Sequence, residues 1–348
     1  MLNQTTLSWF RIFRTNNIGP ISFHSLYKKF SNPDDAIDYL QKARKLVPSI
    51  EQVMVEVRAT ANFGALIVSF HDSHYPKALK AIRDAPPFLI AKGNLDLLSR
   101  DCIAIVGSRS SSIHGNRIAY NLADNLAEAG YVIVSGMARG IDRNAHLGAK
   151  SNTIAVVAHG IDHVYPAENK DLHAQIVNNA LVLTESPIGT APIAHLFPGR
   201  NRIVAGLCNA TVVVEATRHS GSLITAQHAL DYGREVLAVP GCPLDPRAYG
   251  PNTLIQSGAY LVQNHHDVLG QLSGIKRTAT YEPPIEESDE PMIPRDQLLG
   301  MLSNVPTTID ALHQHFPYSI GQLRRTLVEL EIDGIVQHLP GDQVVMAN

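Results

Sequence analysis

The chain has 348 residues, more than one hydrophobic core usually holds, so the sequence predicts two or three domains. Hydrophobic residues make up 45% and charged residues 18% of the chain, a composition that excludes general disorder. The chain has 29 Lys and Arg residues and 32 Asp and Glu residues, which gives a formal net charge of -3. Overall charge therefore cannot attract the protein to nucleic acid, and any basic site must be local.

Residues 1–74 predict a small helical domain, with helices over Thr6–Arg14 and Phe23–Phe30. The turn Ile18-Gly19-Pro20 between them resembles a helix-hairpin-helix, whose backbone amides can meet a phosphate; a packing role is the alternative. The N-terminus lacks a signal-peptide pattern, and no run in the chain reaches the roughly 18 apolar residues of a membrane helix. We therefore expect no membrane association.

Residues 75–274 predict a core domain of α/β class. After a connector over residues 75–100, short apolar runs alternate with helical segments, which is typical of a doubly wound fold. The runs are apolar throughout, as expected for strands that are covered on both faces of a mainly parallel sheet. The expected strands are Ile103–Val106, Tyr131–Val134, Ile154–Val157, Leu181–Thr184, Thr211–Val214, Glu235–Val239 and Tyr260–Val262.

The last part of the chain predicts a linker and a third domain. Residues 275–294 are acidic and rich in proline, which indicates an extended linker. Residues 295–348 then predict three helices, the second and third with Thr308 and Ser319 as N-caps, and a hairpin around residues 340–342. Three helices followed by a hairpin indicate a winged-helix domain.

Small residues and arginines follow the expected strands, at the edge of a parallel sheet where ligands bind. Gly107, Ser108 and Arg109 lead into a helix, and Arg139 lies in a second Gly-rich turn. Helix N-termini attract anions, and a guanidinium binds phosphate with two donors. The first loop lacks a full GxGxxG pattern, so a nicotinamide site is not supported. The alternative is that the glycines only allow tight turns and the arginines are solvated.

Two further segments favour an anion site. Arg200, Asn201 and Arg202 are placed at the start of a helix, where cations oppose the helix dipole unless an anion binds there. A fourth anion-friendly turn opens another helix and consists of Ser220, Gly221 and Ser222.

The sequence shows no matched catalytic set and no metal-binding motif, so we expect no catalytic residue, no metal and no cofactor. Glu185 and Glu215 end two strands and are candidate acids or bases, or acceptors that bind loop amides and orient the arginines; Asp142 can act similarly by capping a helix. The aromatic residues Tyr165, Phe197 and Tyr249 either stack on bases or fill the core beneath the loops. The three cysteines are far apart, which fits a reducing cytosol and a cytoplasmic protein.

Taken together, these segments resemble the DNA-processing protein A family, DprA or Smf, over roughly residues 70–270. The motifs that carry the resemblance are VGSR at 106–109, SGMARGID at 135–142, HGIDHVYPAEN at 159–169, TESPIGTAP at 184–192, FPGRNRIVAGL at 197–207, SGSLITAQHAL at 220–230 and GPNTLIQSGA at 250–259. The helical N-terminal domain and the winged helix also look like the flanking domains of that family.

The resemblance implies a Rossmann-like core that binds single-stranded DNA, forms dimers and tetramers and loads the RecA recombinase during natural transformation, without catalysis. It implies DNA contacts by Gly107, Ser108, Arg109, Arg139, Arg200, Asn201 and Arg202. Two alternative functions stay open. One is a nucleotide or phosphoribosyl hydrolase that uses a Gly-rich loop and Glu215, and the other is a regulator that binds duplex DNA mainly through its winged helix.

Overall fold

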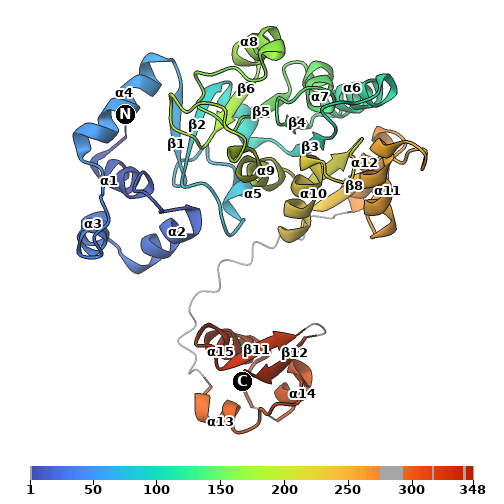
Figure 1. The fold of residues 1–348 in the computed structure, drawn as a ribbon. Helices are drawn as coiled ribbons and strands as arrows, with labels where there is room; N and C mark the ends of the chain where they lie inside the picture. Colours follow the sequence, from blue (N-terminus) through green and yellow to red (C-terminus); the bar gives the residue numbers. More distant parts are fainter. Residues whose placement is uncertain (1, 275–292, 316, 340–341, 348) are drawn as a thin grey trace. The chain divides into compact units, whose positions relative to one another are not determined.

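The structure is a computed structural model that describes residues 2–274, 293–315, 317–339 and 342–347 (Figure 1). The chain divides into two compact units, residues 1–276 and residues 277–348. The predicted linker, apart from residues 293 and 294, lies outside the described residues. None of the described helices combines the length and the apolar character needed to cross a membrane.

The first unit begins with four helices around an aromatic core. They are α1 (Gln4–Phe13), α2 (Pro20–Lys29), α3 (Pro33–Lys42) and α4 (Ile50–Asn62). Side chains of Asn3, Asn32 and Ser49 cap three of their N-termini, which satisfies amides that have no partner inside the helix. Phe88 lies outside the four helices, yet its ring is 5.0 Å from that of Phe10. The helices and the following sheet therefore share a hydrophobic cluster.

The described part of the same unit contains a nine-stranded sheet in the order β1-β2-β6-β5-β4-β3-β7-β8-β9. The pairs from β6 to β9 are parallel, and the pairs β1–β2 and β2–β6 are antiparallel. The strands are β1 (Leu66–Ser69), β2 (Phe88–Gly93), β3 (Cys102–Val106), β4 (Val132–Ser135), β5 (Thr153–Val156), β6 (Leu181–Thr184), β7 (Ala210–Val213), β8 (Glu235–Ala238) and β9 (Tyr260–Leu261).

Helices cover both faces of the sheet, which confirms the doubly wound, mainly parallel fold. On one face α6 (Ile113–Glu128), α7 (Ile141–Ala149) and α12 (His265–Gly274) share a cluster with alternate strand residues such as Ile103 and Ile105. The other face is covered by α5 (Lys77–Lys80), α8 (Lys170–Asn179), α9 (Leu196–Leu207), α10 (Gly221–Asp231) and α11 (Tyr249–Gln256). Short 3₁₀ helices are η1 (Leu95–Ser99), η2 (Ala167–Asn169) and η3 (Pro246–Ala248).

All seven predicted strands are present; Leu181–Thr184 has the predicted bounds, and the ends of the other strands differ from the prediction by at most one residue. The expected connector over residues 75–100 is wrong in one respect, because it contains α5, β2 and η1. Strand β1 precedes residue 75 and pairs with β2 in this sheet. The boundaries of the three domains stay predictions.

The second unit has the predicted winged-helix arrangement. Its helices are α13 (Arg295–Leu299), α14 (Ile309–His313) and α15 (Ile320–Ile332). Strands β11 (Val336–Leu339) and β12 (Gln343–Met346) form the expected antiparallel hairpin, and β10 (Thr307–Thr308) adds a third strand beside β12. The Thr308 side chain accepts a hydrogen bond from the Ala311 amide and Ser319 accepts one from Gln322, so both predicted N-caps are confirmed.

Candidate functional site

The strand order of the sheet reverses between β3 and β7. The chain leaves β3 toward β4, β5 and β6 on one side and returns through β7 to β8 and β9 on the other. In open α/β sheets, ligands bind at such a point, outside the carboxyl ends of the strands. A groove of about 540 Å³ lies there, lined by the loops after β3, β4 and β7 and by the starts of α9 and α10.

Most of the predicted site residues meet in this groove. Those that line it are Gly107, Ser108, Arg109, Arg200, Asn201, Ser220, Gly221 and Ser222. Arg139 lines an adjoining pocket of about 100 Å³. Arg202 lines neither cavity, although it follows Asn201 directly.

The loop after β3 is held by Glu215, which lies two residues after the end of β7. The Ser108 amide donates to the Glu215 carbonyl at 2.6 Å, and the Glu215 carboxylate accepts from the amide and hydroxyl of Ser112 at 2.9 and 2.5 Å. Gly107 allows the close approach, since a Cβ there would lie 2.8 Å from the Glu215 carbonyl oxygen. Glu215 therefore accepts a hydrogen bond from a loop amide, which is the second of the two roles predicted for it.

The loop after β4 is held by Asp142. Its carboxylate accepts from the amides of Gly136 and Ala138 at 3.1 and 3.3 Å. The N-cap of α7 is Gly140, so the expectation that Asp142 caps its helix is wrong. The Asp142 carboxylate instead accepts hydrogen bonds from two loop amides that lie outside the helix. Burial raises the pKa of Asp142, and the nearby charge of Arg200 acts in the opposite direction.

Arg200 forms the buried floor of the groove. Its guanidinium donates to the carbonyl of Val156 at the end of β5, and its Nε has no hydrogen-bond partner among the described residues. Burial lowers the pKa of Arg200 to about 10, which still leaves it charged at neutral pH. The guanidinium lies directly against Gly136, where a Cβ would overlap it. The positive charge is thus fixed beneath the loop after β4.

Arg202 faces away from the groove toward the β6 side of α9. It donates to the Glu185 carboxylate and, at 2.6 Å, to the Asp84 carbonyl. Burial raises the pKa of Glu185, and the charge of Arg202 lowers it. The sequence predicts an anion beside this arginine, and in the structure that anion is the carboxylate of Glu185. Glu185 therefore orients an arginine, as predicted. Any contact between Arg202 and DNA stays a prediction.

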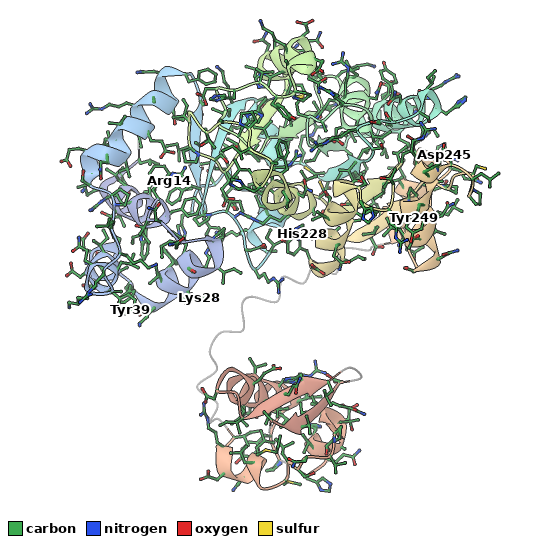
Figure 2. All side chains as sticks on the ribbon, viewed as in Figure 1. Arg14, Lys28, Tyr39, His228, Asp245 and Tyr249 are labelled. Atoms are coloured by element: carbon green, nitrogen blue, oxygen red, sulfur yellow. The ribbon has the colours of Figure 1, made fainter. Side chains whose placement is uncertain are left out.

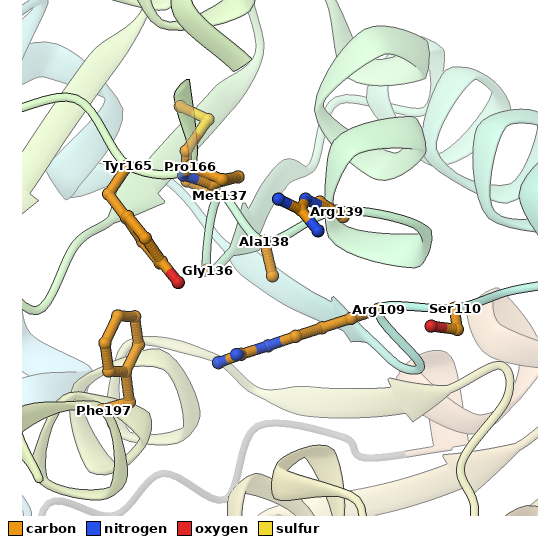
Figure 3. Close-up of a pocket in the computed structure, with 9 residues that line it drawn as sticks. All are labelled: Arg109, Ser110, Gly136, Met137, Ala138, Arg139, Tyr165, Pro166 and Phe197. Carbon is orange, nitrogen blue, oxygen red and sulfur yellow. The ribbon is translucent and has the colours of Figure 1, made fainter. Parts of the chain in front are cut away.

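Arg109 and Arg139 are exposed at the rim. Arg109 extends across the smaller pocket toward Phe197, and its guanidinium lies 5.3 Å from the ring centroid (Figure 3). The ring of Tyr165 is 5.7 Å from that of Phe197 and is 41% exposed, so these two rings border the pocket instead of filling the core. Arg139 forms an ion pair with Glu168. No carboxylate in the described part of the chain pairs with Arg109 in this way.

Sequence reasoning overlooked three residues of the site. Thr217 and His219 line the groove between β7 and α10, and Glu168 neutralises Arg139. Thr217 and His219 lie between a predicted strand and the predicted turn Ser220–Ser222, so their position after a strand was the available signal. Within the described ranges, no three His, Cys, Asp or Glu side chains form a metal-binding group.

Three family models match the chain along most of its length. The model for DNA recombination-mediator protein A matches residues 66–273, a DprA-like N-terminal helix-hairpin-helix domain matches residues 3–59, and a DprA winged-helix domain matches residues 282–342. The central match contains all of the groove residues.

Curated relatives and solved structures agree with the family models. The DNA processing protein DprA of Streptococcus pneumoniae is 47% identical over 206 residues, which are 58% of this chain and 73% of the relative. The DprA protein of Bacillus subtilis is 40% identical over 241 residues, 68% of this chain and 80% of the relative.

The crystal structure of the S. pneumoniae protein matches with a TM-score of 0.62 and 38% identity, covering 78% of this chain and 93% of that one. A DNA processing protein A structure from Helicobacter pylori, which concerns its single-stranded DNA binding mode, matches with a TM-score of 0.56 and 29% identity, covering 60% and 96%. The chain belongs to the DNA processing protein A family, also called DprA or Smf.

Proposed function

We propose that this protein is a non-catalytic recombination mediator that binds single-stranded DNA in the groove at the carboxyl ends of β3, β4 and β7. The observation that carries the proposal is the composition of the groove. The N-terminus of α10, several serine residues and the exposed Arg109 guanidinium line the groove together with Phe197. These groups suit phosphates and the flat face of an unpaired base, and both are available along a single strand of any sequence.

The buried charge of Arg200 supports the same conclusion. A buried guanidinium places a positive charge beneath the groove, beside the carboxylate of Asp142, although the formal net charge of the chain is -3. The proposed contacts in the groove and its adjoining pocket are Gly107, Ser108, Arg109, Arg139, Arg200, Asn201, Ser220, Gly221 and Ser222; Arg202, which lines neither cavity, stays a predicted contact outside them. The single-stranded DNA binding of the H. pylori relative supports this choice of ligand.

In the cell, the protein protects incoming single strands in the cytoplasm and hands them to the RecA recombinase during natural transformation, as a homodimer or larger homo-oligomer. Membership of the DNA recombination-mediator family supports this role. The hydrolase alternative is not favoured by the relatives, and the Glu215 carboxylate that it required is engaged by Ser112. Purified protein is expected to release no free base from nucleoside monophosphates.

The binding proposal is tested by gel shifts with single-stranded and duplex oligonucleotides of equal length across a salt series. The wild type should prefer the single strand and lose affinity with salt. Arg109→Ala should weaken single-strand binding about tenfold, because one charge-assisted contact is lost. Lys42→Ala removes an exposed charge on α3 and serves as the control. Wild-type affinity of the Arg109→Ala variant at physiological salt would contradict the proposed site.

A further inference from the structure

A second pair of arginine and aromatic ring lies beyond the groove, on its β8 side. The guanidinium of Arg218 is 5.6 Å from the ring centroid of Tyr249, which resembles the 5.3 Å between Arg109 and Phe197. Tyr249 begins α11 and is 45% exposed (Figure 2). An exposed ring of this size outside the core has a face available to a ligand.

Backbone contacts hold this pair against the wall of the groove. The Ala216 amide donates to the Arg247 carbonyl at 2.7 Å, and the Gly250 amide donates to the Ala216 carbonyl at 2.8 Å. A Cβ at Gly250 would lie 2.7 Å from the Cβ of Ala216, so this glycine allows the start of α11 to approach the turn after β7. Tyr249 is therefore fixed beside the turn that carries Arg218.

The turn itself is continuous with the groove. The Ser220 amide donates to the Thr217 carbonyl at 3.0 Å and closes the turn around Arg218. Thr217 and His219, the two neighbours of Arg218, both line the groove. A strand that leaves the groove across β7 thus meets Arg218 and Tyr249 next.

The charge of Arg218 is not neutralised by a carboxylate within the described residues. Asp245 is bound by Arg247 through two contacts of 2.9 Å, and Glu215 is bound by Ser112. An exposed arginine without an acidic partner is free to bind a phosphate, and it keeps only a weak cation–π contact when it does not. The same description applies to Arg109, which lines the groove itself.

We propose that Tyr249 is a second base-stacking platform, with Arg218 binding the adjoining phosphate, so that the bound strand extends past the switch point to the end of β8. This inference rests on the proposed function. Stacking on an aromatic ring is independent of base identity, which suits a mediator that must accept any sequence. A short oligonucleotide held in the central groove does not reach this platform, whereas a longer one does.

The test measures affinity as a function of oligonucleotide length for the full chain. The affinity of the wild type for oligothymidylates should rise with oligonucleotide length. The affinity of the Tyr249→Ala variant should stop rising at a shorter length. For long oligonucleotides Tyr249→Ala should lose about 5-fold to 150-fold in affinity, the range for one stacked base, and Tyr249→Phe should lose little. Arg218→Ala should reduce the slope of log affinity against log salt by about 0.7, as expected for one phosphate of a single strand.

Tyr39→Ala is a matched control, because Tyr39 is also 45% exposed and has Lys29 over its ring, but lies on α3 away from the groove. Wild-type affinity of Tyr249→Ala for every length would overturn the inference. An equal loss at all lengths would also overturn it, since a merely structural role of Tyr249 predicts that result. If the wild type itself does not bind single strands, the proposed function fails first.

Discussion

Arg109, Arg139 and Arg202 carry the same charge but differ in what compensates it. Arg202 is paired with Glu185 in the interior, and Arg139 is paired with Glu168 at the surface, where both side chains are about 60% exposed. Arg109 lies over the ring of Phe197 and has no carboxylate partner among the described residues. An exposed ion pair is worth about 1 kcal/mol or less, so Arg139 can leave Glu168 for a phosphate at little cost.

Removing the charge of Glu168 should therefore strengthen binding. In the Glu168→Gln variant, Arg139 does not have to break an ion pair with a carboxylate before it binds a DNA phosphate. The affinity for single-stranded DNA should therefore rise about 2-fold to 5-fold. Fluorescence anisotropy with a labelled oligonucleotide measures the effect. Asp124→Asn is the control, because it releases Lys150 in the same way at the far ends of α6 and α7. Equal gains in both variants would mean that only net charge matters.

His146 makes the stability of the first unit depend on pH. Its side chain is buried beneath the loop after β4, where Nε2 accepts from the Met137 amide at 3.3 Å and Nδ1 contacts the Thr153 hydroxyl at 2.7 Å. Burial, together with the charge of Arg200, lowers its pKa to about 3. The folded protein therefore keeps this histidine neutral under conditions in which an unfolded chain protonates it.

The free energy of unfolding should fall as pH decreases from about 6.5 toward 3, because the unfolded chain binds a proton that the folded chain does not. His146 contributes a loss of about 1.4 kcal/mol per pH unit at most. Urea unfolding across this range should show a smaller loss for His146→Gln than for the wild type. The exposed His114→Gln variant is the control and should follow the wild type. Identical pH profiles for all three proteins would refute the role of His146.

The loop after β4 shows how an element places a charge. Gly136 follows β4 directly, and a Cβ there would overlap the buried guanidinium of Arg200. Gly136→Ala should therefore displace Arg200, lower the free energy of unfolding by about 1–3 kcal/mol and weaken DNA binding. Gly199→Ala is the control, because a Cβ meets nothing within 4 Å there, and it should stabilise α9 slightly. Urea unfolding and gel shifts check both variants.

The parallel strands β3 to β8 could be predicted because each is a mostly apolar run that is buried on both faces, whereas the edge strand β9 is exposed. Strands β1 and β2 could not, because Pro86-Pro87 indicates a loop and the antiparallel pairing joins distant segments. Likewise, the order of loops after strands predicted that Arg109 and Arg200 meet. The sequence could not separate Arg200 from Arg202, since two residues differ by about 200° around a helix and only packing decides which faces the groove.

At the scale of the whole molecule, every described groove residue lies in the first unit. A chain that ends at residue 276 should therefore fold cooperatively and keep its affinity for single-stranded DNA. Gel shifts and thermal unfolding of this shortened protein test the expectation against the full chain. Loss of all binding on shortening would transfer the DNA-binding role to the winged helix.

The position of Phe88 limits how this chain can exchange parts with a relative by recombination. Phe88 is the first residue of β2, yet its ring lies within about 6 Å of the rings of Phe10, Phe13 and Phe23 in the helical part. A chimera that takes the helices from a relative must therefore take this strand residue as well, or leave a hole between them. The N-terminal helices α1 to α4 and strand β2 must therefore come from the same parent protein.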